Sequence, residues 1–114
     1  MLPKKNRIPG SGRVKEVLSS GKRFSAGLLS VKFRPSPVPD SQFAVVISKK
    51  TCKQAVGRNR LRRQIMEVIR LALPAVKTPV RAVIIAKPSA VTAPFKEIES
   101  DLNRFFKNLN PNAK

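Results

Sequence analysis

Hydrophobic residues recur along the chain with two different spacings, and the spacing predicts which secondary structure each segment forms. Three segments have apolar residues three or four positions apart, as on one face of a helix. Three others alternate with polar residues or form short apolar runs, as in strands. We expect helices over residues 12–21, 54–73 and 94–109 and strands over residues 28–33, 43–48 and 80–86. The order is α-β-β-α-β-α, and an additional short strand fits near Phe24.

Glycine and proline residues mark where these elements end. Gly21 follows the first helix, and we expect it to stop that helix in a left-handed conformation. Pro74 ends the long helix. Residues 35–41 contain three prolines and therefore form a loop between the first two strands. We predict that these two strands pair antiparallel and that the second, more apolar strand is central in the sheet.

The two longer helices each have one apolar face, which predicts that both pack on a sheet. In the long helix this face consists of Leu61, Ile65, Val68, Ile69 and Ala72. In the last helix it consists of Phe95, Ile98, Leu102, Phe105, Phe106 and Leu109. Glu97, Glu99 and Asp101 lie early in the last helix, where acidic side chains interact favourably with the helix dipole. We therefore expect an α+β fold in which a small mixed sheet packs against helices as a two-layer sandwich.

The chain has 114 residues, the length of one domain, and its 41% hydrophobic content is enough for a folded core. We expect a single domain over residues 1–114, in which residues 1–12 form a basic arm and residues 110–114 a flexible tail.

The strongest signal in the composition is positive charge. Lys and Arg number 24 against 6 Asp and Glu, so the net charge is +18. A polyanion that binds the protein would relieve the repulsion within such a chain. No apolar run approaches the roughly 20 residues that span a bilayer, and the basic N-terminus lacks the apolar segment of a secretory signal. We therefore expect a nucleic acid rather than a membrane as the partner, and a cytoplasmic location.

The residues that the chain lacks exclude several kinds of chemistry. It contains no histidine and one cysteine, Cys52, so neither an internal disulfide nor a Cys/His zinc site can form. A nuclease usually needs histidines or carboxylates that converge on metal ions, and the few acids here suit other roles. We expect no catalytic residue and no metal ligand in this chain.

The start of the long helix carries an unneutralised basic surface. At 100° per residue, Asn59, Arg60, Arg63 and Arg70 project opposite the apolar face, and Arg62 flanks them. Arg58 points nearer the apolar side, so it either precedes the regular helix or extends its side chain along the surface. Positive charge at a helix N-terminus opposes the helix dipole, a cost that bound phosphate would offset. The preference for arginine suits bidentate contacts to phosphate.

The segment ISKKTCKQAVGRNRLRRQIMEVIR, residues 47–70, resembles the signature of the bacterial ribonuclease P protein subunit. LPKKNRI, GKRF and AVIIAKP are also similar to that family, so the resemblance covers nearly the whole chain. It implies a protein that binds a large catalytic RNA and helps it to remove the 5′ leader of precursor tRNA. The RNA would perform the hydrolysis and hold most of the magnesium. The residues that the resemblance implies to bind RNA are Lys49, Lys50, Lys53, Arg58, Asn59, Arg60, Arg62 and Arg63, and the outward face of the long helix adds Arg70 as a further candidate.

The resemblance also implies a cleft between the first helix and the sheet that holds the single-stranded leader. The residues at the matching positions are Val14, Val17, Leu18, Lys32 and Phe33. The family usually has an aromatic residue at Val14 and often at Leu18 and Lys32. Stacking of a base on an aromatic ring contributes about 1–3 kcal/mol, so we expect a weaker or more electrostatic grip on the leader. The family further implies a left-handed β-α-β crossover, an exception to the usual right-handed connection.

Three other functions fit parts of the sequence. A ribosomal or other structural RNA-binding protein would have the same composition, and the RNA that co-purifies would distinguish it. A DNA-compacting protein is disfavoured by the single globular core without repeats, and a preference for duplex DNA would revive it. A stand-alone nuclease would have to cleave RNA as a highly purified protein without its own RNA.

Overall fold

The computed structural model describes residues 2–109, which form three α-helices and four strands in the expected order, with the additional strand present. The helices are α1 (Ser11–Ser20), α2 (Ala55–Ala72) and α3 (Phe95–Leu109). The strands are β1 (Lys22–Ala26), β2 (Leu29–Pro35), β3 (Gln42–Val46) and β4 (Val80–Ala86). Short 3₁₀ turns cover Lys4–Asn6, Leu73–Ala75 and Pro88–Ala90. None of the helices within residues 2–109 has the length and apolar character needed to cross a membrane.

The strands form one mixed sheet in the order β1-β2-β4-β3. β4 pairs antiparallel with β2 and parallel with β3, so the predicted pairing of residues 28–33 with 43–48 is wrong, and β3 is an edge strand rather than a central one. β4 takes a central place because it is the most completely buried strand, with only Ile85 half-buried. An apolar strand of this kind is most stable where neighbouring strands cover both of its edges and helices cover both of its faces.

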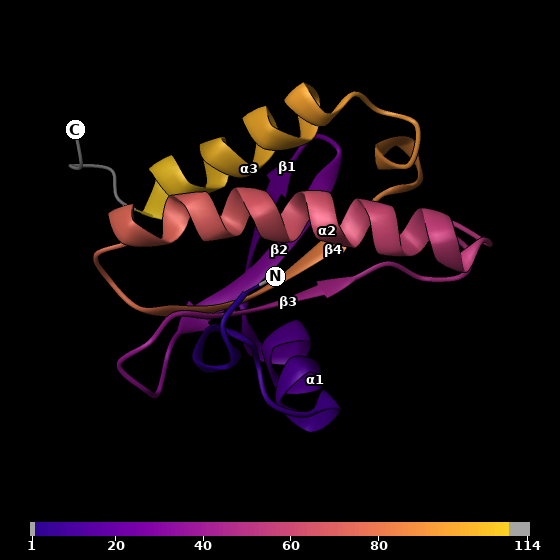
Figure 1. Ribbon diagram of the computed structural model, residues 1–114. Helices are drawn as coiled ribbons and strands as arrows, with labels where there is room; N and C mark the ends of the chain where they lie inside the picture. Colours follow the sequence, from indigo (N-terminus) through magenta and orange to yellow (C-terminus); the bar gives the residue numbers. More distant parts are fainter. Residues whose placement is uncertain (1, 110–114) are drawn as a thin grey trace.

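Helices cover both faces of the sheet (Figure 1). α2 and α3 pack on one face, where Val31, Ile84, Ile65 and Phe105 belong to the main core. α1 packs on the opposite face, where Val17 contacts the side chains of a smaller cluster. The α+β class is confirmed, and α1 adds a partial third layer to the expected two-layer sandwich. Phe95, expected on the core face of α3, occupies the first position of that helix and is 36% exposed.

β3, α2 and β4 form a β-α-β unit, because β3 and β4 are parallel neighbours and α2 lies between them in sequence. This is the unit for which the family resemblance implies a left-handed connection, and its hand stays a prediction.

The basic N-terminal segment packs against the fold instead of projecting as an arm. Leu2, Asn6 and Ile8 are buried, and the Asn6 side-chain amide donates a 2.8 Å hydrogen bond to the Ser41 carbonyl. Arg7 forms a bridge to Phe43 on β3. This segment therefore covers part of the sheet edge that would otherwise be open to pairing with another chain. The expected tail, residues 110–114, lies outside the described residues.

Gly21 ends α1 as predicted, but in an extended conformation (φ −76°) rather than a left-handed one. A glycine is needed there because the chain turns tightly onto β2. A Cβ at this position would lie 2.6 Å from the Val17 carbonyl oxygen and 3.0 Å from the Phe33 backbone nitrogen.

Candidate nucleic-acid interface

The basic surface begins in the loop that joins β3 to α2, and Ser48 shapes this loop. The backbone N–H groups of Thr51 and Cys52 donate to the Ser48 carbonyl at 3.0 and 3.1 Å, and the Ser48 and Thr51 hydroxyls lie 3.0 Å apart. Lys49 and Lys50 occupy the tip of this turn and are exposed. The hydrogen bonds therefore hold two lysines outward on ordered backbone.

Arg58 lies within α2, and its side chain turns back to the loop. One guanidinium nitrogen donates to the carbonyl oxygens of Cys52 and Lys53, both at 2.8 Å. The side chain is half-buried. The geometry resolves the two possibilities that the sequence left open for Arg58: it extends along the surface to fasten the loop to the helix. Part of its hydrogen-bonding capacity is therefore already used within the protein.

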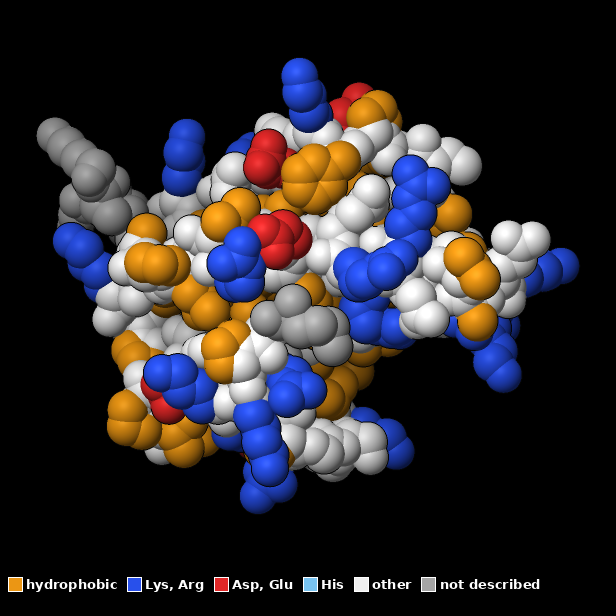
Figure 2. Space-filling model, in the orientation of Figure 1, with side chains coloured by type: hydrophobic (Ala, Val, Ile, Leu, Met, Phe, Trp, Pro, Cys, Tyr) orange, Lys and Arg blue, Asp and Glu red, His pale blue; other side chains and the backbone are white. Residues whose placement is uncertain are grey.

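The outward face of α2 beyond Arg58 carries the predicted contact residues. Asn59, Arg60 and Arg63 are exposed, and half-buried Arg62 donates a 2.9 Å hydrogen bond to the Asn59 side-chain oxygen. Within residues 2–109, Arg60 and Arg63 have neither a hydrogen-bond partner nor an ion-pair partner for their side chains. Lys and Arg side chains gather where α2 begins, on the right of Figure 2, and no acidic side chain is visible among them. This face therefore presents uncompensated positive charge on a rigid element.

Arg70 differs from these arginines because it is paired. Its guanidinium makes two hydrogen bonds to the Glu67 carboxylate, at 3.0 and 2.6 Å. The hydrogen bond between them lowers the pKa of Glu67 and raises that of Arg70. Ten residues of helix separate Arg70 from Arg60, a distance of about 15 Å along the axis. Arg70 is thus both distant from the basic cluster and neutralised by its neighbour.

The predicted leader-binding residues divide between the two faces of the sheet. Val14 and Leu18 of α1 are half-buried in the small cluster beneath that helix. Lys32 is half-buried. Its side chain lies on the same face of the sheet as that of Arg34, two residues further along β2, and Arg34 pairs with Glu16 of α1 at 3.0 Å. These three positions are compatible with a cleft beside α1.

Val17 and Phe33 do not fit that cleft, and their assignment to it is corrected by the structure. Val17 is completely buried and packs against Ile8 and Val83, so it has no surface to offer a leader. Phe33 points to the opposite face, where its ring lies 5.3 Å from that of Phe105 in an edge-on arrangement. Alternation along β2 places Lys32 and Phe33 on different faces, since neighbouring strand residues point in opposite directions.

Other residues, which were not predicted from the sequence, also lie on the face of the sheet that α1 covers. Ala44, Val46 and Ile85 are half-buried there and pack beside Val14 and Leu18. The alternation of residues within β3 and β4 could have indicated these positions. It does not show, however, which set of alternating residues faces which helix.

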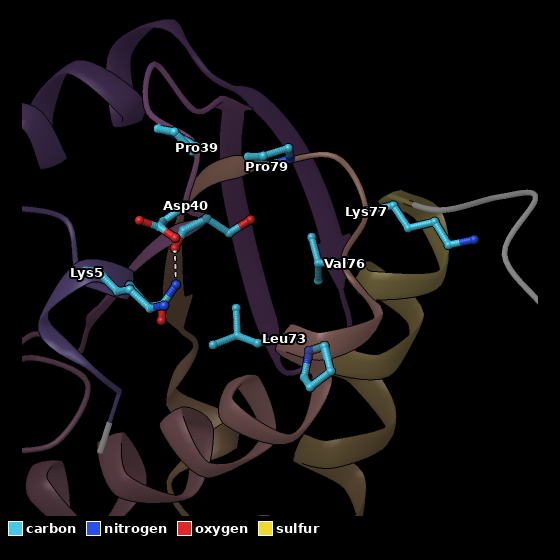
Figure 3. A pocket seen from close by; sticks show the side chains of 10 residues that line it. Lys5, Pro39, Asp40, Leu73, Val76, Lys77 and Pro79 are labelled. Carbon is cyan, nitrogen blue, oxygen red and sulfur yellow. Dashed lines mark hydrogen bonds between the residues drawn. The ribbon is translucent and has the colours of Figure 1, made fainter.

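A hollow of about 380 Å³ lies at the other end of α2 (Figure 3). Leu73 and Val76 provide apolar surface, Pro39 and Pro79 border it, and the N-terminal segment forms another side. Its charged side chains are Lys5, Lys77 and Asp40. This hollow could not be predicted from the sequence, because its residues come from separate parts of the chain. Because its charged side chains include an acid, this hollow is a poorer site for a polyanion than the start of α2.

Comparison with known protein sequences places the chain in a family. The family model described as Ribonuclease P matches residues 2–110. A ribonuclease P protein component from Microcystis aeruginosa is 34% identical over 113 residues, which cover 96% of this chain and 94% of that protein. The corresponding component from Coxiella burnetii is 30% identical over 111 residues and covers 95% of this chain and 88% of its own length.

Solved structures share the fold. An RNase P protein mutant from Staphylococcus aureus, described as defective in mRNA degradation activity, superposes with a TM-score of 0.84 at 19% identity, covering 94% of this chain and 90% of its own. The RNase P protein from Thermotoga maritima gives a TM-score of 0.80 at 20% identity, covering 90% and 96%. The sequence matches over almost the whole chain, together with this fold, show that the protein belongs to the ribonuclease P protein family.

Proposed function

We propose that this chain is the protein component of ribonuclease P and supports removal of the 5′ leader from precursor tRNA. The observation that carries the proposal, beyond family membership, is a pair of arginines on an ordered basic surface at the start of α2: Arg60 and Arg63, whose side chains have no partner among residues 2–109. The family match also disfavours the alternative of a ribosomal or other structural RNA-binding protein.

In this proposal the catalytic RNA performs the hydrolysis and the protein chain is not itself catalytic. Within residues 2–109, no three acidic, histidine or cysteine side chains come together in a group that could hold a metal ion. Glu16, Glu67 and Asp101 are instead paired with arginines. These residues do not fit a magnesium ion held by the protein, so the proposal leaves magnesium with the RNA and assigns no step to protein-bound metal.

In this proposal, two surfaces of the protein contact two different RNAs. The lysine turn and the exposed face of α2 contact phosphates of the catalytic RNA, because arginine matches phosphate geometry and the helix fixes its direction. The surface beside α1 holds the single-stranded leader. It offers Lys32 for the backbone and the apolar side chains of Val14 and Leu18 for the bases. The proposed location is the cytoplasm, where precursor tRNA is made.

Reconstitution tests the proposal. The protein is mixed with the ribonuclease P RNA of the same organism and with precursor tRNA, and cleavage is followed at low magnesium. We expect the protein to restore cleavage that the RNA alone performs poorly under these conditions, since added positive charge replaces part of the counterion requirement. If cleavage does not increase, the protein is not a ribonuclease P subunit. Ribosomal RNA as the co-purifying species would point to the alternative.

Single substitutions test which arginines contact the RNA. Each phosphate contact removed should lower the log–log slope of affinity against salt by about 0.7–0.9. We expect this loss for Arg60→Ala and for Arg63→Ala, and a smaller one for Arg70→Ala, because Glu67 already neutralises Arg70. Lys77→Ala is the matched control, since it removes one exposed charge at the other end of α2. Equal slopes for the Arg60, Arg63 and Lys77 variants would show that the contacts are not localised at the start of α2.

A further inference from the structure

A second hollow lies beside the basic face of α2, where the helix meets the segment that leads into α3. Its volume is about 360 Å³. α2 contributes one wall, and the chain following the Pro88–Ala90 turn contributes the other. The lining residues are Gly57, Arg60, Leu61, Gln64, Val91, Thr92 and Ala93. Because Arg60 belongs both to this hollow and to the exposed basic face, the hollow adjoins the surface that is proposed to bind RNA.

The polar side chains that line this hollow form no hydrogen bonds with other described residues of the protein. Arg60, Gln64 and Thr92 have no side-chain hydrogen-bond partner in the part of the chain that the structure describes. The other α2 arginines on either side of Arg60 differ: Arg58 and Arg62 both donate to neighbouring groups. Three different polar groups thus line one hollow, and none of them has a side-chain hydrogen bond within residues 2–109.

The chemistry of these groups fits a nucleobase better than a phosphate. A phosphate needs cations or N–H donors and makes no use of an apolar wall. Here Leu61 is buried, and Val91 and Ala93 are half-buried against the hollow. An amide offers both a donor and an acceptor, and a hydroxyl can serve as either, which suits the mixed edge of a base. A guanidinium plane can stack on a base, and sequence-specific proteins commonly recognise unstacked RNA bases by these contacts.

We propose that this hollow receives one unpaired base of the RNA that binds α2. Gln64 and Thr92 hydrogen-bond to the edge of the base, and Arg60 contacts the base or its phosphate. The inference rests on the proposed function for the identity of that RNA. It adds a base contact to a surface that otherwise contacts only the phosphate backbone, so one nucleotide would give this surface sequence specificity.

Chemical probing of base edges tests this inference on the full protein bound to its ribonuclease P RNA. The variant Gln64→Met with Thr92→Val removes the polar groups but keeps the size of both side chains, and methionine keeps the helix propensity. With the wild-type protein, we expect one unpaired base to be protected at its Watson–Crick edge. With the double variant, we expect this protection to be lost and the affinity to fall about tenfold, while backbone protections and the salt slope stay unchanged.

Arg63→Gln is the matched control, because Arg63 lies on the same helix outside the lining of the hollow. It should lower the affinity and the salt slope while leaving the base protected. If no base depends on Gln64 and Thr92 while the wild-type protein binds and stimulates cleavage, the inference is wrong and the proposed function stands. Loss of all protections in the double variant would also overturn it, because the two side chains would then belong to the general binding surface. Failure of the wild-type protein to stimulate cleavage would overturn the proposed function itself.

Discussion

Asp101 of α3 is predicted to be the acidic residue on which the fold depends most. Its carboxylate accepts a 2.9 Å hydrogen bond from the Leu28 backbone N–H, in the turn between β1 and β2, and a 2.8 Å bond from Arg104. Gly27 in the same turn has φ +68°, and a Cβ there would lie 2.9 Å from the carboxylate. The turn can therefore come this close to Asp101 only with a glycine at position 27. Asp101→Ala should leave the Leu28 N–H without this acceptor and weaken the attachment of the hairpin to α3.

The magnitude follows from the two contacts. Loss of the acceptor from a buried donor costs about 1–3 kcal/mol, and the part-buried position of the Leu28 N–H places the cost in the lower half of that range. The ion pair adds about 0.5 kcal/mol at most, because the Arg104 side chain is 57% exposed. We expect Asp101→Ala to lower the free energy of unfolding by about 1–2.5 kcal/mol. Asp101→Asn keeps an oxygen acceptor and should cost less than about 1 kcal/mol.

Urea denaturation followed by circular dichroism measures this difference. For a small protein, a loss of that size lowers the midpoint by roughly 1 M urea, with the slope m unchanged. Removing an acid from a chain of charge +18 also increases self-repulsion, and salt screens this contribution but not the lost hydrogen bond. The loss should therefore persist at high salt. An Asp101→Ala protein within about 0.5 kcal/mol of wild type, or a loss that disappears with salt, would refute the structural role.

Two further predictions concern α2. Because the pKa of Glu67 is lowered in the folded protein, its contribution to stability is present above the ordinary carboxyl value of 4.5 and is lost as the pH falls through the lowered value. The unfolding free energy of wild type should therefore exceed that of Glu67→Gln at neutral pH and converge with it in acid; a constant difference across this range would contradict the reasoning. Gly57→Ala gains about 1 kcal/mol of helix propensity, but its Cβ would lie 2.8 Å from the Cys52 sulfur. We expect a net loss in thermal stability that Cys52→Ala reverses in the double variant, and independent effects of the two substitutions would show that the sulfur is not the obstacle.

The elements of this protein could be predicted from the sequence because they depend on local periodicity. Residues three and four apart share a helix face wherever the helix packs, so the apolar face that includes Leu61, Ile65 and Ile69 was identifiable without knowing its partner. The nearly continuous apolar run over residues 80–86, interrupted only by Arg81, likewise required burial on both faces, and β4 has the predicted bounds. Charge is also a property of the sequence, so the basic face of α2 could be located before its surroundings were known.

Pairing between distant segments could not be predicted in this way. Alternation in β2 separates Lys32 from Phe33 but does not say which of them faces α1, and the apolar character of residues 43–48 does not distinguish an edge strand from a central one. The contacts of individual polar groups are equally non-local.

Only the tertiary structure determines that Asp101 reaches Leu28 and that Thr92 lies across a hollow from Gln64. The physical reason is that local patterns report how much of each segment must be buried. Which surfaces meet depends instead on the free energy of the whole arrangement, to which every element contributes.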